Sequence, residues 1–263
     1  MLNEAVDKGI NYFDTADLYE KGENEKLVGR AFRGKRQQVI LATKVGNQWR
    51  PDGSGWDWNP RKSYILQAVE ASLQRLQTDY LDLYQLHGGT LDDPIEETIE
   101  AFELLQQQGK IRYYGISSIR PNVIRKYITK SNIVSVMMQY SLLDRRPEEV
   151  CLDLLHQNQI SVLARGSLAQ GLLAGKPPKE YLNYSEKEVA RAVESIASTQ
   201  QPLTNVAIQY VLQHPAVASA VLGIRTPTQL QAALMTAASV KLSDQVIQEL
   251  QDTIKPNLYE QHR

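Results

Sequence analysis

The sequence lacks most of the features that mark secreted, membrane or nucleic-acid-binding proteins. Cys151 is the only cysteine, so no internal disulfide can form, and its apolar neighbours predict a buried helix position rather than a reactive thiol. No apolar run approaches the roughly 20 residues of a membrane span. The formal net charge of -1 offers no attraction to nucleic acid or to an anionic membrane. The first residues have no basic-then-apolar signal pattern, so we expect a cytoplasmic protein with neither kind of partner, in an oligomeric state that the sequence leaves open.

What the sequence does contain is typical of a globular α/β protein. Hydrophobic residues make up 42% of the 263 residues and charged residues 22%. Short apolar runs alternate with longer helical patterns, which predicts a parallel sheet covered by helices. The expected strands are Ile10–Phe13, Val39–Thr43, Leu81–Leu86, Tyr113–Ile116, Val134–Met138, Ser161–Ala164 and Ser219–Leu222. The expected helices are Leu2–Lys8, Glu25–Arg33, Lys62–Leu76, Ile95–Gln108, Pro121–Lys130, Pro147–Gln157, Glu186–Thr199 and Leu203–Gln213.

The number of strands leaves two architectures open. Seven strands fit either an open sheet or a (β/α)₈ barrel that lacks its first strand, and the spacing of about 25 to 40 residues per unit suits the barrel. Because the sequence has no internal repeat, linker or low-complexity segment, we expect one domain over residues 1–263.

Polar side chains lie at the ends of successive predicted strands. Asp14, Lys44 and His87 close the first three strands, and Tyr19 lies in the loop after the first. The next three strands end in further polar residues, which are Ser117 with Ser118, Gln139 and Arg165. One such residue is ordinarily a solvated strand end. Six strands in succession favour an active site, because the carboxyl ends of barrel strands share one rim.

The residue types at these strand ends suggest carbonyl chemistry. A tyrosine is a poor acid at neutral pH, but a lysine ammonium beside it favours the phenolate and makes it a usable proton donor. An aspartate holds the lysine charged, and a neutral histidine orients the same substrate oxygen. The set contains no nucleophile and no clustered metal ligands. We therefore predict no metal site and a separate hydride donor, a nicotinamide cofactor.

Four segments resemble the signature segments of the aldo-keto reductase family. They are Asn11–Tyr19, Ala42–Lys44, Asp82–His87 and Gly109–Ser118, in the family's order. The run Gly115–Pro121, together with Arg165, is similar to that of a bacterial branch. The resemblance implies a (β/α)₈ barrel that uses NADPH to reduce small aldehydes and ketones to alcohols. Tyr19 would be the general acid, Lys44 its activator, Asp14 the partner of Lys44, and His87 the group that orients the carbonyl.

The resemblance also implies a set of cofactor-binding residues. Ser117, Ser118 and Gln139 match positions that hold the nicotinamide carboxamide, and Arg165 stands where relatives commonly stack a tyrosine on the nicotinamide. The segment Ser167–Leu173 is similar to the loop that crosses the phosphates, with Ser167, Leu168 and Gly171 as its candidates. The segment that binds the adenosine 2'-phosphate would supply Gly223, Arg225 and Gln229, although Arg225 is also readable as an ordinary surface arginine.

Two departures from the family pattern keep other functions open. Ala232 and Ala233 replace a Glu–Asn pair that contacts adenine, and the chain starts partway into the first helix, so we expect the natural chain to begin earlier by about one βα unit with its cap. The alternative of another class is a cofactor-binding regulatory or scaffold protein, like the family's potassium-channel β-subunits, or an inactive truncated form. Oxidation of a sugar or polyol at the same site is a third. Trp49, Trp56 and Trp58 follow Lys44 and are expected either to line the substrate site or to pack a loop.

Overall fold

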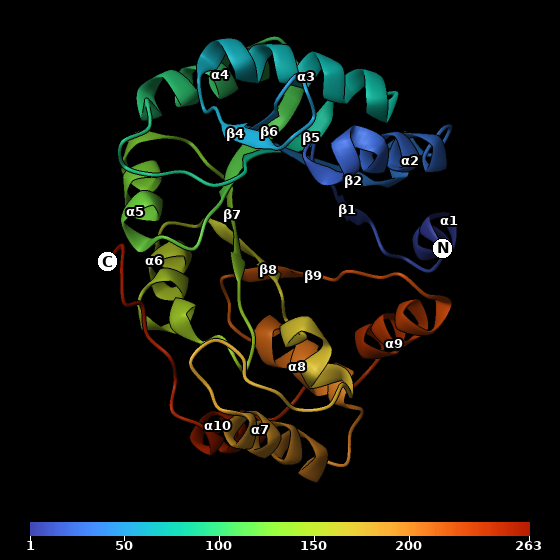
Figure 1. The fold of residues 1–263 in the computed structure, drawn as a ribbon. Coiled ribbons are helices and arrows are strands. Elements are labelled where there is room, and N and C mark those ends of the chain that lie inside the picture. Colours follow the sequence, from blue (N-terminus) through green and yellow to red (C-terminus); the bar gives the residue numbers. More distant parts are fainter. The chain divides into compact units, whose positions relative to one another are not determined.

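The computed structural model describes residues 1–263 as two compact units (Figure 1). The first comprises Met1–Ser118 and Asn122–Val136, and the second comprises Ile119–Pro121 and Met137–Arg263. The order of the strands in the main sheet is β1-β2-β5-β6-β7-β8-β9, and β7 (Ser135–Gln139) carries the chain from the first unit to the second. The division into two compact units does not test the prediction that the chain forms a single domain.

The first unit contains four neighbouring parallel strands. They are β1 (Tyr12–Asp14), β2 (Ile40–Val45), β5 (Leu81–Leu86) and β6 (Ile111–Ser117). The register pairs Asp14 with Ala42, and Lys44 with Gln85. The backbone N–H of His87 then donates to the carbonyl oxygen of Val45 at 2.8 Å, so His87 directly continues the pairing of β5 with β2.

Helices cover these strands through apolar faces. The helical elements of this unit are α1 (Leu2–Asp7), η1 (Tyr19–Gly22), α2 (Glu23–Ala31), η2 (Arg36–Gln38), α3 (Lys62–Leu76), α4 (Ile95–Gln107) and α5 (Pro121–Lys130). Helix α3 buries Ile65, Val69 and Leu76 and packs on β2 between α2 and α4 (Figure 1). Close approach of α2 to α3 requires Gly29, where a Cβ atom would lie 2.6 Å from the backbone oxygen of Arg75.

The second unit pairs β8 (Ser161–Arg165) with β9 (Val217–Val221) in parallel. Its helical elements are η3 (Arg146–Glu149), α6 (Cys151–Gln157), η4 (Ala169–Ala174), α7 (Glu186–Ser198), α8 (Leu203–Leu212), α9 (Pro227–Ala237) and α10 (Asp244–Thr253). Helix α8 packs on β9 and against α7 and α9, whereas α6 packs on β8. A capping box of Ser185 and Glu188 fixes the start of α7. No helix of the chain has the length and apolar character needed to cross a membrane.

The predicted strands and helices are confirmed with few exceptions. The bounds of Leu81–Leu86, Lys62–Leu76 and Pro121–Lys130 agree with β5, α3 and α5. The segment after Lys44 is not a plain loop: it forms an antiparallel hairpin of β3 (Asn47–Trp49) and β4 (Trp56–Trp58), whose three-residue strands are too short for a periodic signal.

Two further differences concern the second half of the chain. The expected helix Pro147–Gln157 is divided into η3 and α6 at Val150, whose φ of -158° is not helical. Helices α9 and α10 were not predicted, although Thr226 and Ser243 cap their first turns by the usual side-chain hydrogen bonds.

Candidate active site

Lys44 is the centre of the group of predicted catalytic residues. Its side chain is only 1% exposed, and its ammonium donates to the Asp14 carboxylate and, at 2.9 Å, to the carbonyl oxygen of Thr15. The hydroxyl of Tyr19 lies 3.4 Å from the same Nζ atom. These contacts arise because β1 and β2 are neighbours in register and the loop after Asp14 turns back over Lys44.

Asp14 is held on its other side by a residue that the sequence did not single out. Gln85 donates from Nε2 to Asp14 Oδ1 at 3.3 Å. Burial raises the pKa of the Asp14 carboxyl, whereas the Lys44 ammonium and the Gln85 amide oppose that rise. Gln85 was recognisable in principle, because it alternates with Leu83 and His87 and therefore lies on the same face of its strand.

Tyr19 and His87 form the accessible side of this group. The Tyr19 side chain is 39% exposed at the start of η1, and its ring meets the His87 ring edge-on, with centroids 5.8 Å apart. The Lys44 ammonium lies 5.0 Å from the centroid of the Tyr19 ring. A small molecule at Tyr19 would therefore meet a phenol and an imidazole, with a buried cation behind the phenol.

A second tyrosine near Asp14 differs from Tyr19 in its surroundings. The hydroxyl of Tyr12 is buried, and burial together with the Asp14 charge raises the pKa of Tyr12. Tyr12 therefore stays a neutral phenol inside the sheet, and Tyr19 is the tyrosine that combines exposure with proximity to Lys44.

The β3–β4 hairpin contacts both loops that carry the aromatic site residues. The indole N–H of Trp49 donates to the carbonyl oxygen of Leu18 at 3.3 Å, directly before Tyr19. The indole N–H of Trp58 donates to Asp93 at 2.9 Å. The ring of Trp58 packs where a Cβ on Gly46 would be 2.5 Å away and one on Gly88 3.3 Å away. Loop packing, one of the two roles expected for these tryptophans, is thus present; a role in lining the substrate site stays a prediction.

The predicted cofactor residues fall in both units. Ser117 ends β6 in the first unit, and Ser118, which is buried, directly follows it. In the second unit, Arg165 Nη1 donates to Gln139 Oε1 at 3.1 Å, so two consecutive strand ends are joined there. Gln139 also donates to the Tyr181 hydroxyl at 3.1 Å.

The remaining predicted cofactor residues lie in two segments of the second unit. Ser167 is buried and Leu168 precedes η4, in which Ala169, Gln170 and Gly171 all have positive φ angles, of 45°, 59° and 96°. Gly223 and Arg225 precede α9; the backbone N–H of Arg225 donates to Gln229 Oε1 at 2.7 Å, inside the capping box of Thr226 and Gln229. Hydrogen bonds thus join Gln139 to Arg165 and Arg225 to Gln229. Gly223, which has no side chain, belongs to neither pair.

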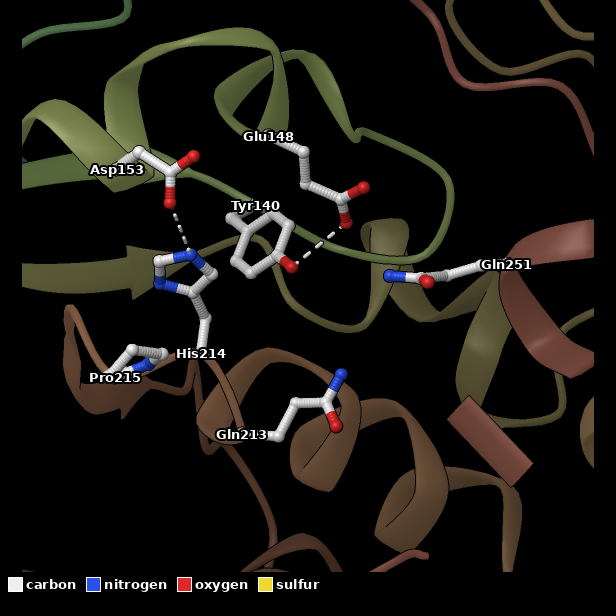
Figure 2. Close-up of a pocket in the computed structure, with 7 residues that line it drawn as sticks. All are labelled: Tyr140, Glu148, Asp153, Gln213, His214, Pro215 and Gln251. Atoms are coloured by element: carbon white, nitrogen blue, oxygen red, sulfur yellow. Dashed lines mark hydrogen bonds and ion pairs between the residues drawn. The ribbon is translucent and has the colours of Figure 1, made fainter. Parts of the chain in front are cut away.

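One cavity of the second unit contains none of the predicted site residues. It has a volume of about 290 Å³ and is lined by Tyr140, Glu148, Asp153, Gln213, His214, Pro215 and Gln251 (Figure 2). Glu148 accepts from the hydroxyls of Tyr140 and Tyr210 at 2.9 and 2.6 Å, and His214 faces Asp153 at 3.5 Å. These polar groups are therefore hydrogen-bonded or ion-paired with one another. No group of three or more metal-ligating side chains occurs in the structure.

Comparison with known proteins identifies the family. The aldo/keto reductase family profile matches residues 1–255. An uncharacterized oxidoreductase, YqkF of Bacillus subtilis, is 52% identical over 274 residues, covering 100% of this chain and 89% of that protein. The holo form of aldo-keto reductase AKR11C1 from Bacillus halodurans superimposes with a TM-score of 0.95 at 52% identity, over 99% of this chain and 89% of the other. An aldo/keto reductase of Klebsiella pneumoniae in complex with NADP and acetate gives a TM-score of 0.81 at 26% identity, over 99% and 86% of the two chains.

The chain belongs to the aldo/keto reductase family. Its fold is accordingly that of the family's (β/α)₈ barrels, and the resemblance predicted from the signature segments is confirmed. It is a member of a family of oxidoreductases that use NAD(P)H.

Proposed function

We propose that this protein reduces an aldehyde or ketone to an alcohol with NADPH, and that Tyr19 supplies the proton. The observation that carries the proposal is the position of the Lys44 ammonium, which is bonded to Asp14 and lies 3.4 Å from the hydroxyl of the exposed Tyr19. The arrangement provides an acid, a buried cation that favours its conjugate base, and a counter-ion that keeps the cation charged.

The residues of the first unit suit the protonation half of this reaction. A carbonyl oxygen beside Tyr19 would accept a hydrogen bond from the phenol and another from His87, whose ring stands edge-on to that of Tyr19. A nicotinamide cofactor, when bound, would supply hydride to the carbonyl carbon. As negative charge develops on the oxygen, Tyr19 gives up its proton, and the Lys44 ammonium stabilises the phenolate left behind.

The residues of the second unit fit a phosphorylated nicotinamide cofactor. The bonded pair Gln139 and Arg165 offers an amide and a planar guanidinium at two strand ends. Arg225, which directly precedes the capping box of α9, offers an exposed cation for a 2'-phosphate. The NADP complex of the Klebsiella relative supports this choice of cofactor.

Steady-state turnover of the purified protein with NADPH and a generic aldehyde tests the proposal. Wild type should consume NADPH, and Tyr19→Phe should lower kcat by about 10²- to 10⁴-fold, as expected for loss of a general acid. Tyr113→Phe is the matched control, because Tyr113 is 54% exposed on β6. Equal turnover by wild type and Tyr19→Phe would exclude Tyr19 as the acid.

A further inference from the structure

Asp17 is a buried carboxylic acid in the loop that joins Asp14 to Tyr19. Its side chain is almost fully buried, and its backbone N–H donates to the carbonyl oxygen of Lys44 at 3.3 Å. Oδ2 accepts a long hydrogen bond of 3.4 Å from the Tyr64 hydroxyl, and Oδ1 is buried without a hydrogen-bond partner. A carboxylate in such a position is poorly stabilised, because burial removes water and only the long bond from Tyr64 and the Leu18 backbone oppose that loss.

Arg75, the cation whose charge lowers the pKa of Asp17, is already paired with another acid. Glu25 on α2 is completely buried and accepts from Arg75 Nε at 2.6 Å and from Thr43 Oγ1 at 2.6 Å. Arg75 can pass into this position because Gly22 lacks a Cβ atom, which would lie 2.7 Å from its Cδ. Arg75 therefore balances Glu25, and Asp17 faces a second carboxylate across this cluster.

The charges of the cluster do not balance if every group is ionised. Three acids, Asp14, Asp17 and Glu25, share two cations, Lys44 and Arg75. The other titratable groups that face Asp17 are Tyr64 on α3 and Tyr84 on β5, and burial raises the pKa of both phenols, so they stay neutral. Burial, reinforced by the charge of Glu25 and opposed by Arg75, raises the pKa of Asp17 to about 7.

We propose that Asp17 is a positioning residue for Tyr19 that works as a neutral carboxylic acid. The loop around it is short and held by backbone hydrogen bonds to β2 and within itself. The Thr15 N–H donates to Ala42, and the Tyr19 N–H donates to the carbonyl oxygen of Ala16 at 3.1 Å. When Asp17 loses its proton, repulsion from Glu25 and the demand of the new charge for water both push the loop away from α2. Tyr19 lies two residues further along that loop, so its hydroxyl leaves the position beside Lys44.

The pH dependence of stability gives the first test and needs no turnover. Unfolded Asp17 loses its proton near pH 4, whereas the folded residue holds it up to about pH 7. The Asp17 contribution to stability is therefore present below pH 4, falls as pH rises from about 4 to 7, and is constant above that. The Tm of Asp17→Asn should rise relative to wild type by several degrees between pH 5 and pH 8. Parallel Tm curves would show that Asp17 is ionised throughout and would overturn the proposal.

The pH profile of kcat gives the second test and rests on the proposed reductase function. The kcat of wild type should fall as pH rises, with a midpoint near pH 7. Any other titration step of the wild-type profile should also appear in Asp17→Asn. The variant should lack the step near pH 7 and keep KM for the aldehyde. Asp52→Asn, in the exposed tip of the hairpin, is the matched control and should follow wild type. Identical kcat profiles for wild type and Asp17→Asn would show that Asp17 does not position Tyr19, even where the stability curves diverge.

A second variant keeps the proposal testable if Asp17→Asn folds poorly. Glu25→Gln removes the facing carboxylate and frees Arg75 for Asp17, so the midpoint of the kcat step should move below pH 7 by a unit or more. An unmoved midpoint would contradict the assignment of that step to the Asp17–Glu25 pair. Absence of turnover in wild type would instead be a failure of the proposed function, and the Tm comparison would still decide the protonation of Asp17.

Discussion

The region around Lys44 and the region around Arg165 and Arg225 support their polar side chains in different ways. Lys44 is buried and bonded to two neighbouring backbone and side-chain groups, so its position is set by the sheet itself. In the second unit, η4 has successive residues with positive φ, and Arg225 is exposed ahead of α9. A rigid, charge-paired group suits a chemical step, whereas exposed cations and loops suit the binding of a large anion. Variants of the Lys44 region should therefore change stability and kcat, whereas variants of the Arg225 region should change the affinity for the cofactor.

Replacing Lys44 should have the largest effect and should change both stability and rate. Lys44→Met leaves the Asp14 carboxylate buried without its cation, which typically costs about 3–5 kcal/mol of unfolding free energy. The kcat should also fall by about 10²-fold or more, because the Tyr19 phenolate loses its stabilising charge. Chemical denaturation and steady-state kinetics measure the two effects.

A double variant separates these effects of Lys44. Asp14→Asn combined with Lys44→Met removes both charges, so most of the unfolding free energy should return while the low kcat persists. Recovery of activity together with stability would show that Lys44 serves folding only.

Arg225→Ala should have an intermediate effect, confined to cofactor affinity. A charge-assisted bond to a phosphate contributes about 1.5–3 kcal/mol, so the Kd for NADPH should rise by about tenfold or more while that for NADH is unchanged. Fluorescence titration of both cofactors measures this. Arg191→Ala, on the exposed side of α7, is the control. An equal loss of affinity for both cofactors would contradict contact with a 2'-phosphate.

Trp58→Phe should have the smallest effect of these variants. Trp58 belongs to the region around Lys44. The change removes the indole N–H that donates to Asp93 at 2.9 Å but keeps a ring against Gly46 and Gly88. We expect a loss of about 1 kcal/mol in unfolding free energy. Trp56→Phe is the control because Trp56 is 47% exposed, and an equal loss in both variants would argue against a specific role for the Trp58 hydrogen bond.

The two regions also differ in how well the sequence predicts them. Asp14 ends β1, Lys44 is the penultimate residue of β2 and His87 directly follows β5, so pattern and spacing alone place them on one edge of a parallel sheet. The hairpin and the support from Gln85 and Asp17 depend on contacts between segments far apart in the chain, which periodicity does not encode. The roles of Arg165 and Arg225 depended on family resemblance. Arg165 is one of several polar strand ends, and an exposed arginine before a helix, such as Arg225, carries no chemical signature of its own.

The most direct test of the central claim is a single-turnover experiment on Tyr19→Phe with bound NADPH. Cofactor fluorescence reports binding, and the loss of NADPH absorbance after addition of an aldehyde reports reduction in the same sample. We expect the variant to bind NADPH as tightly as wild type and to reduce the aldehyde at least about 10²-fold more slowly. Reduction at the wild-type rate by a variant with bound NADPH would contradict it.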